Sequence, residues 1–297
     1  MRSDPCRRST LGVTIEGANT RLWFTCRSVT MVSEPFDFIK VSSPLLLITD
    51  ILSVNEQDTS QLIRFFCSVA FAADHELGWD PSIQRMKVVD GHVQYEIALD
   101  SANGSSVYVT TCIIAEFGAK AMIGRATRVF KGYCKGDPDK TPVAIKDTWR
   151  SWDREREDVI LGQIFADMGE AKAKDAQKHF LTVLDVDDVV IDGKQDDTLR
   201  LLGGQNPPSD CTMHEVPPEE PPSADKVSKE TTASHTTVPE VADFKVTHRV
   251  HVRIVFKEVC ETLDLVRDLR GVMQMLLDVL KGVNTRKSRC FACLTPL

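Results

Sequence analysis

A lysine and a glutamate eleven residues apart are the side chains of this sequence best suited to chemistry. Lys146 closes the short apolar run Val143-Ala-Ile-Lys146, and Glu157 follows in a segment with helical spacing of apolar residues. A lysine on a buried strand can present its ammonium to phosphate oxygens, and a glutamate on a helix can hold that ammonium in place. Taken alone, each would be an ordinary solvated surface residue. In this order they predict a site for a phosphorylated ligand.

A short loop upstream lies at a distance from Lys146 that two strands and a turn would span. Aligned on Val129, the phosphate-binding pattern G-x-G-x-x-G-x-V would place glycines at positions 122, 124 and 127. The chain has Met122, Gly124 and Thr127 there, so only the middle glycine remains. Close approach of the backbone to phosphates is therefore reduced, while the Thr127 hydroxyl offers a substitute donor.

Hydrophobic periodicity predicts an α+β chain in which most strands pair antiparallel. Alternating residues predict hairpins over 11–26 and 93–114, the second turning at Asn103-Gly104. Helical spacing predicts helices over 59–73, 154–168 and 272–283. Shorter strands are predicted over 125–133, 143–146, 180–184 and 249–259.

The composition argues against a nucleic-acid partner and against a membrane span. A net charge of −7 is opposite to what a phosphate backbone attracts. The strongest apolar run, residues 44–54, is shorter than the ~20 residues that a spanning helix needs. Charged residues interrupt the first 30 positions, where a signal peptide would be apolar. Nine cysteines without regular spacing favour free thiols in a reducing compartment. We therefore expect an intracellular protein, cytoplasmic or nuclear.

One stretch of the chain differs in composition from the rest. Between residues 191 and 244 there are 11 acidic and 4 basic residues, and 7 of the 14 prolines. Such a segment buries too little apolar surface to offset its ordering entropy, so it is predicted to be disordered.

Seven short motifs follow one another in a fixed order. They are Arg21-Leu-Trp-Phe, Ser33-Glu-Pro-Phe-Asp-Phe38, Leu77-Gly-Trp-Asp-Pro81, Gly124-Arg-Ala-Thr-Arg-Val129, Lys146-Asp-Thr-Trp149, Phe180-Leu-Thr-Val183 and Arg253-Ile-Val-Phe-Lys-Glu-Val259. In register, they resemble the fungal-type protein kinase family of mushroom-forming fungi. The resemblance covers most of the chain outside 41–57, 191–244 and the last 14 residues. It implies a kinase-like fold, ATP as cofactor, and phosphorylation of Ser or Thr in a protein substrate that the sequence does not identify.

The resemblance also implies roles for individual residues. Lys146 matches the lysine that anchors ATP, Glu157 matches its helix partner, and Phe256-Lys-Glu-Val259 matches the hinge that would hydrogen-bond adenine. The residues expected to bind the cofactor are Gly124, Val129, Ala144, Lys146, Glu157 and Glu258.

The resemblance divides the chain into five parts. Residues 1–115 form an N-terminal α+β region specific to the family, with 41–57 as an insertion. Residues 116–190 form a kinase-like N-lobe, an antiparallel sheet plus the αC helix. A disordered, acidic, proline-rich insert occupies 191–244. The last N-lobe strand, the hinge and the first C-lobe helices occupy 245–283, and 284–297 form an unstructured tail.

The groups that perform catalysis in a protein kinase do not occur in this sequence. Phosphoryl transfer needs an aspartate that accepts the substrate proton, and an asparagine and a D-F-G aspartate that hold Mg²⁺. We therefore expect no catalytic residue and no metal ligand, although Mg²⁺ belongs to the chemistry of the family. The chain is expected to be a fragment truncated before its catalytic loop and inactive by itself. Translated introns over 41–57 and in the tail are our hypothesis, which sequencing the transcript would test.

Two alternatives stay open beside a kinase fragment. The chain could be a pseudokinase-like scaffold or protein-interaction module without catalysis, or its first ~115 residues could be the end of a separate domain.

Three other patterns are weaker signals of metal binding. Cys290-Phe-Ala-Cys293 lacks the second pair that zinc needs. Residues 188–193 lack the oxygen ligands of a calcium loop. His248 and His251 are expected on opposite faces of a strand, as surface or core residues.

Overall fold

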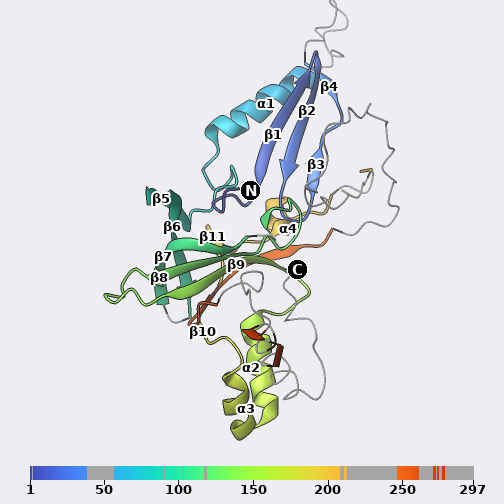
Figure 1. Ribbon diagram of the computed structural model, residues 1–297. Coiled ribbons are helices and arrows are strands. Elements are labelled where there is room, and N and C mark those ends of the chain that lie inside the picture. The colour runs from blue at the N-terminus through green and yellow to red at the C-terminus, as the bar shows by residue number, and fades with distance from the viewer. Residues whose placement is uncertain are drawn as a thin grey trace, which may run out of the picture.

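A seven-stranded antiparallel sheet occupies the middle of the protein (Figure 1). The computed structural model describes residues 1, 3–38, 57–89, 91–102, 104–116, 119–207, 211–212, 246–260, 270–271, 273 and 276–277. The strands of the large sheet lie in the order β10-β13-β9-β8-β7-β6-β5. Their bounds are β5 (Ile83–Val89), β6 (His92–Ser101), β7 (Gly104–Ala115), β8 (Arg128–Cys134), β9 (Val143–Ser151), β10 (Val183–Asp188) and β13 (Arg249–Phe256).

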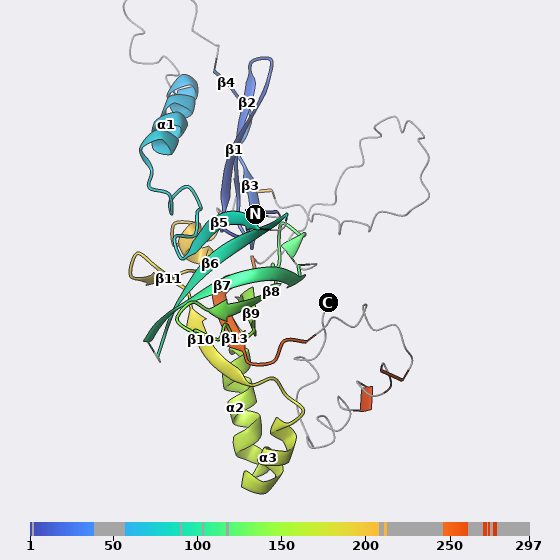
Figure 2. The same cartoon turned by 60° about the vertical axis from the view of Figure 1, so that its left-hand side comes forward.

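A smaller sheet and the helices lie on either side of the large sheet. The small sheet contains β1 (Thr10–Glu16), β2 (Asn19–Thr25), β3 (Thr30–Val32) and β4 (Phe36–Asp37), and α1 (Gln57–Phe71) lies beside it. Figures 1 and 2 both show α2 (Glu157–Met168) and α3 (Glu170–Gln177) on the opposite side of the large sheet. The short elements β11 (Val190–Ile191), β12 (Lys194–Gln195) and α4 (Thr198–Leu201) follow β10.

The large sheet curls until strands from its two halves touch. The Tyr108 hydroxyl of β7 donates to Asp185 of β10 at 3.3 Å, and Arg253 of β13 donates to the carbonyl of Ala98 in β6 at 3.3 Å. The enclosed core contains the buried residues Cys6, Ile83, Tyr95, Ile97, Leu99, Tyr108, Phe130, Val143, Ile145 and Val255. Curling thus buries apolar surface without a covering helix on this inner face of the sheet.

Strand alternation separates the inner face from an outer face with its own apolar cluster. Val143 and Ile145 of β9 belong to the inner core, whereas Ala144 belongs to a cluster with Ile254 and Phe256 of β13. Because successive side chains of a strand point to opposite faces, Lys146 lies on the outer face and Asp147 on the inner one. The charged side chains of β9 therefore lie in two different environments, on the two faces of the sheet.

The structure confirms the antiparallel, sheet-rich chain that the periodicity predicts. The first predicted hairpin is β1 with β2, whose turn includes Gly17 at φ +64°. The second is β6 with β7, which closes at Gly104. The predicted helix over 154–168 begins at Glu157, where two carboxylates of the first turn suit the positive end of the helix dipole, and it ends before Gly169.

The large sheet continues across the predicted boundary at residue 115. β5, β6 and β7 come from the segment assigned to an N-terminal region, and β7 pairs directly with β8. The segment before β1 is also tied to the large sheet, because Arg8 donates to Asp196 at 2.7 Å and Asp196 contacts His251 of β13 at 2.9 Å. Residues on both sides of the predicted boundary thus build one body.

The prediction of disorder is wrong for residues 191–207. β11, β12 and α4 form there, Asp196 and Thr198 are fully buried, and Asp197 caps α4 by accepting from the Arg200 N–H at 2.7 Å. Acidic composition was misleading because these carboxylates have specific partners. The rest of the predicted insert, residues 208–244, lies outside the described residues apart from 211–212. Residues 41–56, most of the predicted 272–283 helix and the tail also lie outside them.

The cap of α4 gives a direct test of order in this segment. Replacing Asp197 with alanine should cost about 1 kcal/mol of unfolding free energy, the usual loss for a helix N-cap. Urea denaturation measures the change. Lys194→Ala, an exposed change three residues away, is the control and should stay within about 0.5 kcal/mol of the parent. Equal stability of both variants would argue against an ordered α4.

Candidate functional site

Lys146 and Glu157 form an ion pair on the outer face of the large sheet. The Nζ of Lys146 donates to Oε2 of Glu157, and their side chains are 26% and 30% exposed. Lys146 lies mid-strand between Val129 of β8 and Ile254 of β13, and Glu157 is the first residue of α2. Within the part of the chain that the structure describes, the Lys146 ammonium has no other hydrogen-bond partner. With respect to those residues, two of its three N–H donors are left for an anionic ligand.

Apolar residues lie on the same face beside the lysine. Val129 is opposite Lys146 in the β8–β9 ladder, and Ala144 precedes Lys146 by two positions. Ala144 is buried and pairs with Phe256, and Val129 packs against the same outer-face cluster. Four of the six predicted site residues thus come together here, as an ion pair beside a small apolar surface.

Gly124 lies outside this group. Its N–H donates to the carbonyl of Arg27 at 2.9 Å, and its φ of +132° is one that glycine adopts without strain. The Thr127 hydroxyl shares a hydrogen bond of 2.8 Å with the Thr148 hydroxyl, two residues beyond Lys146 on β9. Both groups that could approach phosphates are therefore engaged with protein atoms.

Glu258 also uses its carboxylate within the protein. It accepts from the backbone N–H and the hydroxyl of Thr182, at 2.7 and 2.8 Å. Slight burial would raise the pKa of Glu258, but the hydrogen bonds from Thr182, a backbone hydrogen bond at Glu258 and the charge of Lys257 together outweigh burial and lower that pKa. Because Lys257 N–H donates to the Thr182 carbonyl at 2.9 Å, the end of β13 is joined to the start of β10. The side chain of Glu258 closes this junction.

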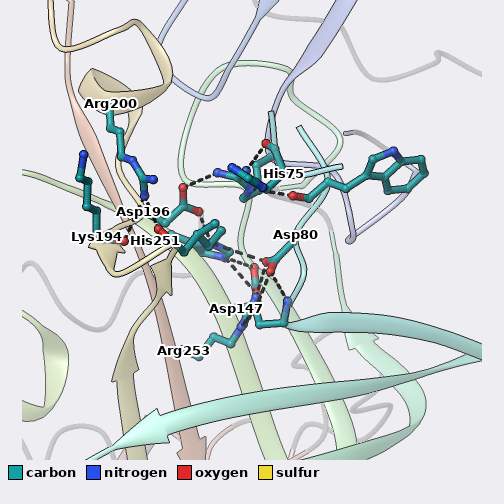
Figure 3. Close-up of polar contacts among 12 residues, drawn as sticks. His75, Asp80, Asp147, Lys194, Asp196, Arg200, His251 and Arg253 are labelled. Atoms are coloured by element: carbon teal, nitrogen blue, oxygen red, sulfur yellow. Dashed lines mark hydrogen bonds and ion pairs between the residues drawn. The ribbon is translucent and has the colours of Figure 1, made fainter. Parts of the chain in front are cut away.

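A cluster of buried charges on the inner face was missed by the sequence analysis (Figure 3). It consists of Arg8, Asp80, Asp147, Asp196, His251 and Arg253, which we call the charge cluster. Arg253 donates to Asp147 at 2.9 Å and to Asp80 at 2.5 Å. His251 lies between Asp147 and Asp196, at 3.1 and 2.9 Å, and stacks on the ring of Trp149. The predicted strand over 249–259 is present as β13, and side chains on both of its faces are buried.

The charge cluster is balanced when His251 is protonated. Three cations then face three carboxylates. Burial would lower the pKa of His251, but Asp147 and the bond to Asp196 outweigh burial and raise it to about 9. Burial likewise opposes ionisation of Asp147 and Asp80, yet His251 and Arg253 hold both pKa values below the usual range. The cluster joins the N-terminal segment to β9 and β13 through buried polar contacts.

Comparison with models of protein families identifies the family of this chain. The model of the family described as "Fungal protein kinase" matches residues 1–286. The chain belongs to the fungal protein kinase family. No curated protein and no solved structure matched the chain. The matched range of this fungal protein kinase family member includes the small sheet as well as the large one.

Membership of a protein kinase family implies ATP, Mg²⁺ and a protein substrate in general terms. The residues around Lys146 fit ATP, because a cation with free donors lies beside a small apolar surface. The described residues contain no group of three or more His, Cys, Asp or Glu side chains that could hold a metal ion. Among them, no helix is long and apolar enough to cross a bilayer, and all seven cysteines are free thiols.

Proposed function

We propose that the outer face of the large sheet binds ATP at Lys146, as the N-lobe of a protein kinase does. The observation that carries the proposal is the ion pair between Lys146 and Glu157. Counted from β7, the strand that bears Lys146 is the third, and the helix that bears Glu157 follows it. Kinases place the phosphate-anchoring lysine on their third strand and its partner on the αC helix. In this proposal β7–β10 and β13 are the N-lobe strands, α2 is αC, and the C-lobe begins after the hinge.

Each residue of the site has a defined task in this proposal. Glu157 orients the Lys146 ammonium, and that ammonium neutralises oxygens of the α- and β-phosphates. Val129 and Ala144 offer an apolar surface to the adenine ring. The backbone of residues 256–259 supplies hinge hydrogen bonds to the adenine edge, while the Glu258 carboxylate stays on Thr182.

The proposed activity of these 297 residues is nucleotide binding without phosphoryl transfer. Ser/Thr phosphorylation is the activity of the family, and it needs the aspartate base and the two metal-binding motifs that the sequence given does not contain. ATP bound at Lys146 would therefore keep its γ-phosphate. The proposal concerns these residues and not a longer chain.

A second candidate function is a kinase-like scaffold that acts through protein contacts. The observation that favours it is the engagement of the Gly124 N–H with Arg27, which withdraws a phosphate donor. Met122 and Thr127 also favour the scaffold, because the phosphate-binding pattern has glycine at both of these positions.

Thermal unfolding with and without ATP separates the two functions. ATP at about ten times its Kd should stabilise the parent chain by about 1.4 kcal/mol. For a body of about 200 residues this raises Tm by roughly 3–6 °C. Lys146→Ala should abolish the shift, because the ammonium that meets the phosphates is gone.

The matched control is Lys194→Ala, which removes an exposed lysine from β12, outside the proposed site. It should keep the full shift. An ATP shift that Lys146→Ala leaves intact, or no shift of the parent at millimolar ATP, would reject the nucleotide site and favour the scaffold.

A further inference from the structure

The turn between β2 and β3 of the small sheet is inserted into the rest of the protein. Residues 26–29 are 0%, 1%, 4% and 5% exposed, although a hairpin turn is ordinarily a solvated element. The Ser28 hydroxyl lies 2.6 Å from both the Thr198 hydroxyl and the Thr247 carbonyl. The turn thus docks on α4 and on the segment that leads into β13.

Arg27, the second residue of this turn, holds the loop that contains Gly124. Its Nη1 donates to the carbonyls of Ala121 and Met122, at 2.8 and 3.4 Å, and its own carbonyl accepts from the Gly124 N–H at 2.9 Å. Its Nη2 donates to the carbonyl of Met1 at 3.0 Å. One residue of the small sheet therefore fixes residues 121–124 by side chain and by backbone.

Holding the loop in this way is electrostatically costly. Burial, and then the nearby charge of Arg128, lower the pKa of Arg27 to about 10. Its recorded acceptors in the described part of the chain are backbone carbonyls, and its Nε has no partner there. A buried guanidinium held by carbonyls alone is poor for stability. Its contribution therefore lies in the position of the loop.

The other half of the loop is fixed by β9, the strand of Lys146. The carbonyl of Arg125 accepts from the Trp149 N–H at 2.7 Å, and the hydroxyls of Thr127 and Thr148 share a hydrogen bond. Because Thr148 lies on the same face as Lys146, residues 125–127 are tied beside the proposed phosphate site. The Arg27 contacts complete the attachment at residues 121–124.

We propose that Arg27 is a positioning residue, by which the small sheet holds the loop of residues 121–127 beside the triphosphate of ATP, while the Gly124 N–H itself stays on the Arg27 carbonyl. This loop has one glycine where the phosphate-binding pattern has three. The contacts with Arg27 hold the loop in one conformation, which ligand contacts would otherwise have to do. This inference rests on the proposed function. It assigns the small sheet a part in nucleotide binding at a distance from the Lys146–Glu157 pair.

Hydrogen exchange and nucleotide affinity in Arg27 variants test the proposal. Arg27→Met keeps the length of the side chain and removes the donors, and Arg27→Lys keeps the charge without the two-pronged donor geometry. In both, exchange of the amides of residues 121–124 should become about tenfold faster or more, as the loop opens locally. ATP should bind about tenfold more weakly, because the loop must then be ordered on binding, while adenosine, which has no phosphates, should bind unchanged.

Arg21→Met, an exposed change on β2, is the matched control and should alter none of these values. If Arg27→Met does not fold, the same measurements on Arg27→Lys decide the question. Unchanged exchange over 121–124, or equal weakening of ATP and adenosine, would overturn the positioning role. If the parent binds neither ligand, the proposed function fails, and the exchange rates alone still decide whether Arg27 positions the loop.

Discussion

Arg253→Met is expected to lower the unfolding free energy by about 3–5 kcal/mol, the usual cost of breaking a buried ion pair from one side. Arg253 is 0% exposed and donates to Asp80, Asp147 and Ser82. Among the described residues, its removal leaves the buried carboxylate of Asp80 with Ser82 and a more distant His251 as partners. Chemical denaturation followed by fluorescence or circular dichroism measures the loss.

Two comparison variants make this expectation specific to the buried site. Arg156→Met also removes an arginine with two carboxylate partners, Asp158 and Asp188, but at a partly exposed place. It should cost no more than about 1 kcal/mol. Adding Asp80→Asn to Arg253→Met should recover part of the loss, because the unpaired charge is then gone. If Arg253→Met costs no more than Arg156→Met, the charge cluster contributes little to stability.

Stability should fall between about pH 6.5 and pH 9 by about 3 kcal/mol, through His251. The folded pKa of His251 is raised to about 9, above the unfolded value of 6.5. The folded state therefore binds the proton more tightly, and its stabilisation is complete below pH 6.5 and lost as pH rises through 9. Asp80, Asp147, Asp196 and Arg253 face the ring. Burial opposes ionisation of Asp80, Asp147 and Arg253, but the opposite charges of the cluster outweigh burial, lowering the pKa values of Asp80 and Asp147 and raising that of Arg253.

Denaturation at pH 6 and pH 9, for the parent and for His251→Gln, measures this dependence. The variant should be less stable than the parent at pH 6, and the difference should shrink toward pH 9. Subtracting the variant cancels other groups, including the Met1 amine, whose lowered pKa acts in the opposite direction. A difference that is constant from pH 6 to pH 9 would mean that His251 is neutral in the folded protein.

The pair Lys146–Glu157 could be predicted because its signal is local. The strand run, the helix and the eleven-residue spacing all lie within one short segment, where periodicity fixes which residues share a face. Val129 and Ala144 could be predicted for the same reason. Ala144 lies two positions before Lys146 on the same strand, and Val129 lies opposite Lys146 in the ladder of β8 and β9. Whether these residues bind ATP is a chemical question that their placement leaves to experiment.

The charge cluster could not be predicted because its members are far apart in the sequence. Arg8 meets Asp196 across 188 positions, and Arg253 meets Asp80 across 173. No periodicity relates such residues, and an acidic count treats Asp196 as a solvated charge. The curl of the sheet could not be predicted for the same reason, because it brings β6 against β10 and β13, which lie at the other end of the strand order.

The place of β13 in the sheet has a consequence for synthesis on the ribosome. β13 is the last of the described strands in the sequence, yet it lies between β9 and β10 and pairs with both. β9 therefore waits with one edge unpaired while about 100 further residues are added, roughly 5–20 s at usual elongation rates. An apolar strand edge exposed for that time is a site of aberrant pairing between nascent chains. The large sheet should thus depend on chaperones until residue 256 has left the exit tunnel, and slowing translation after β9 should lower the soluble yield.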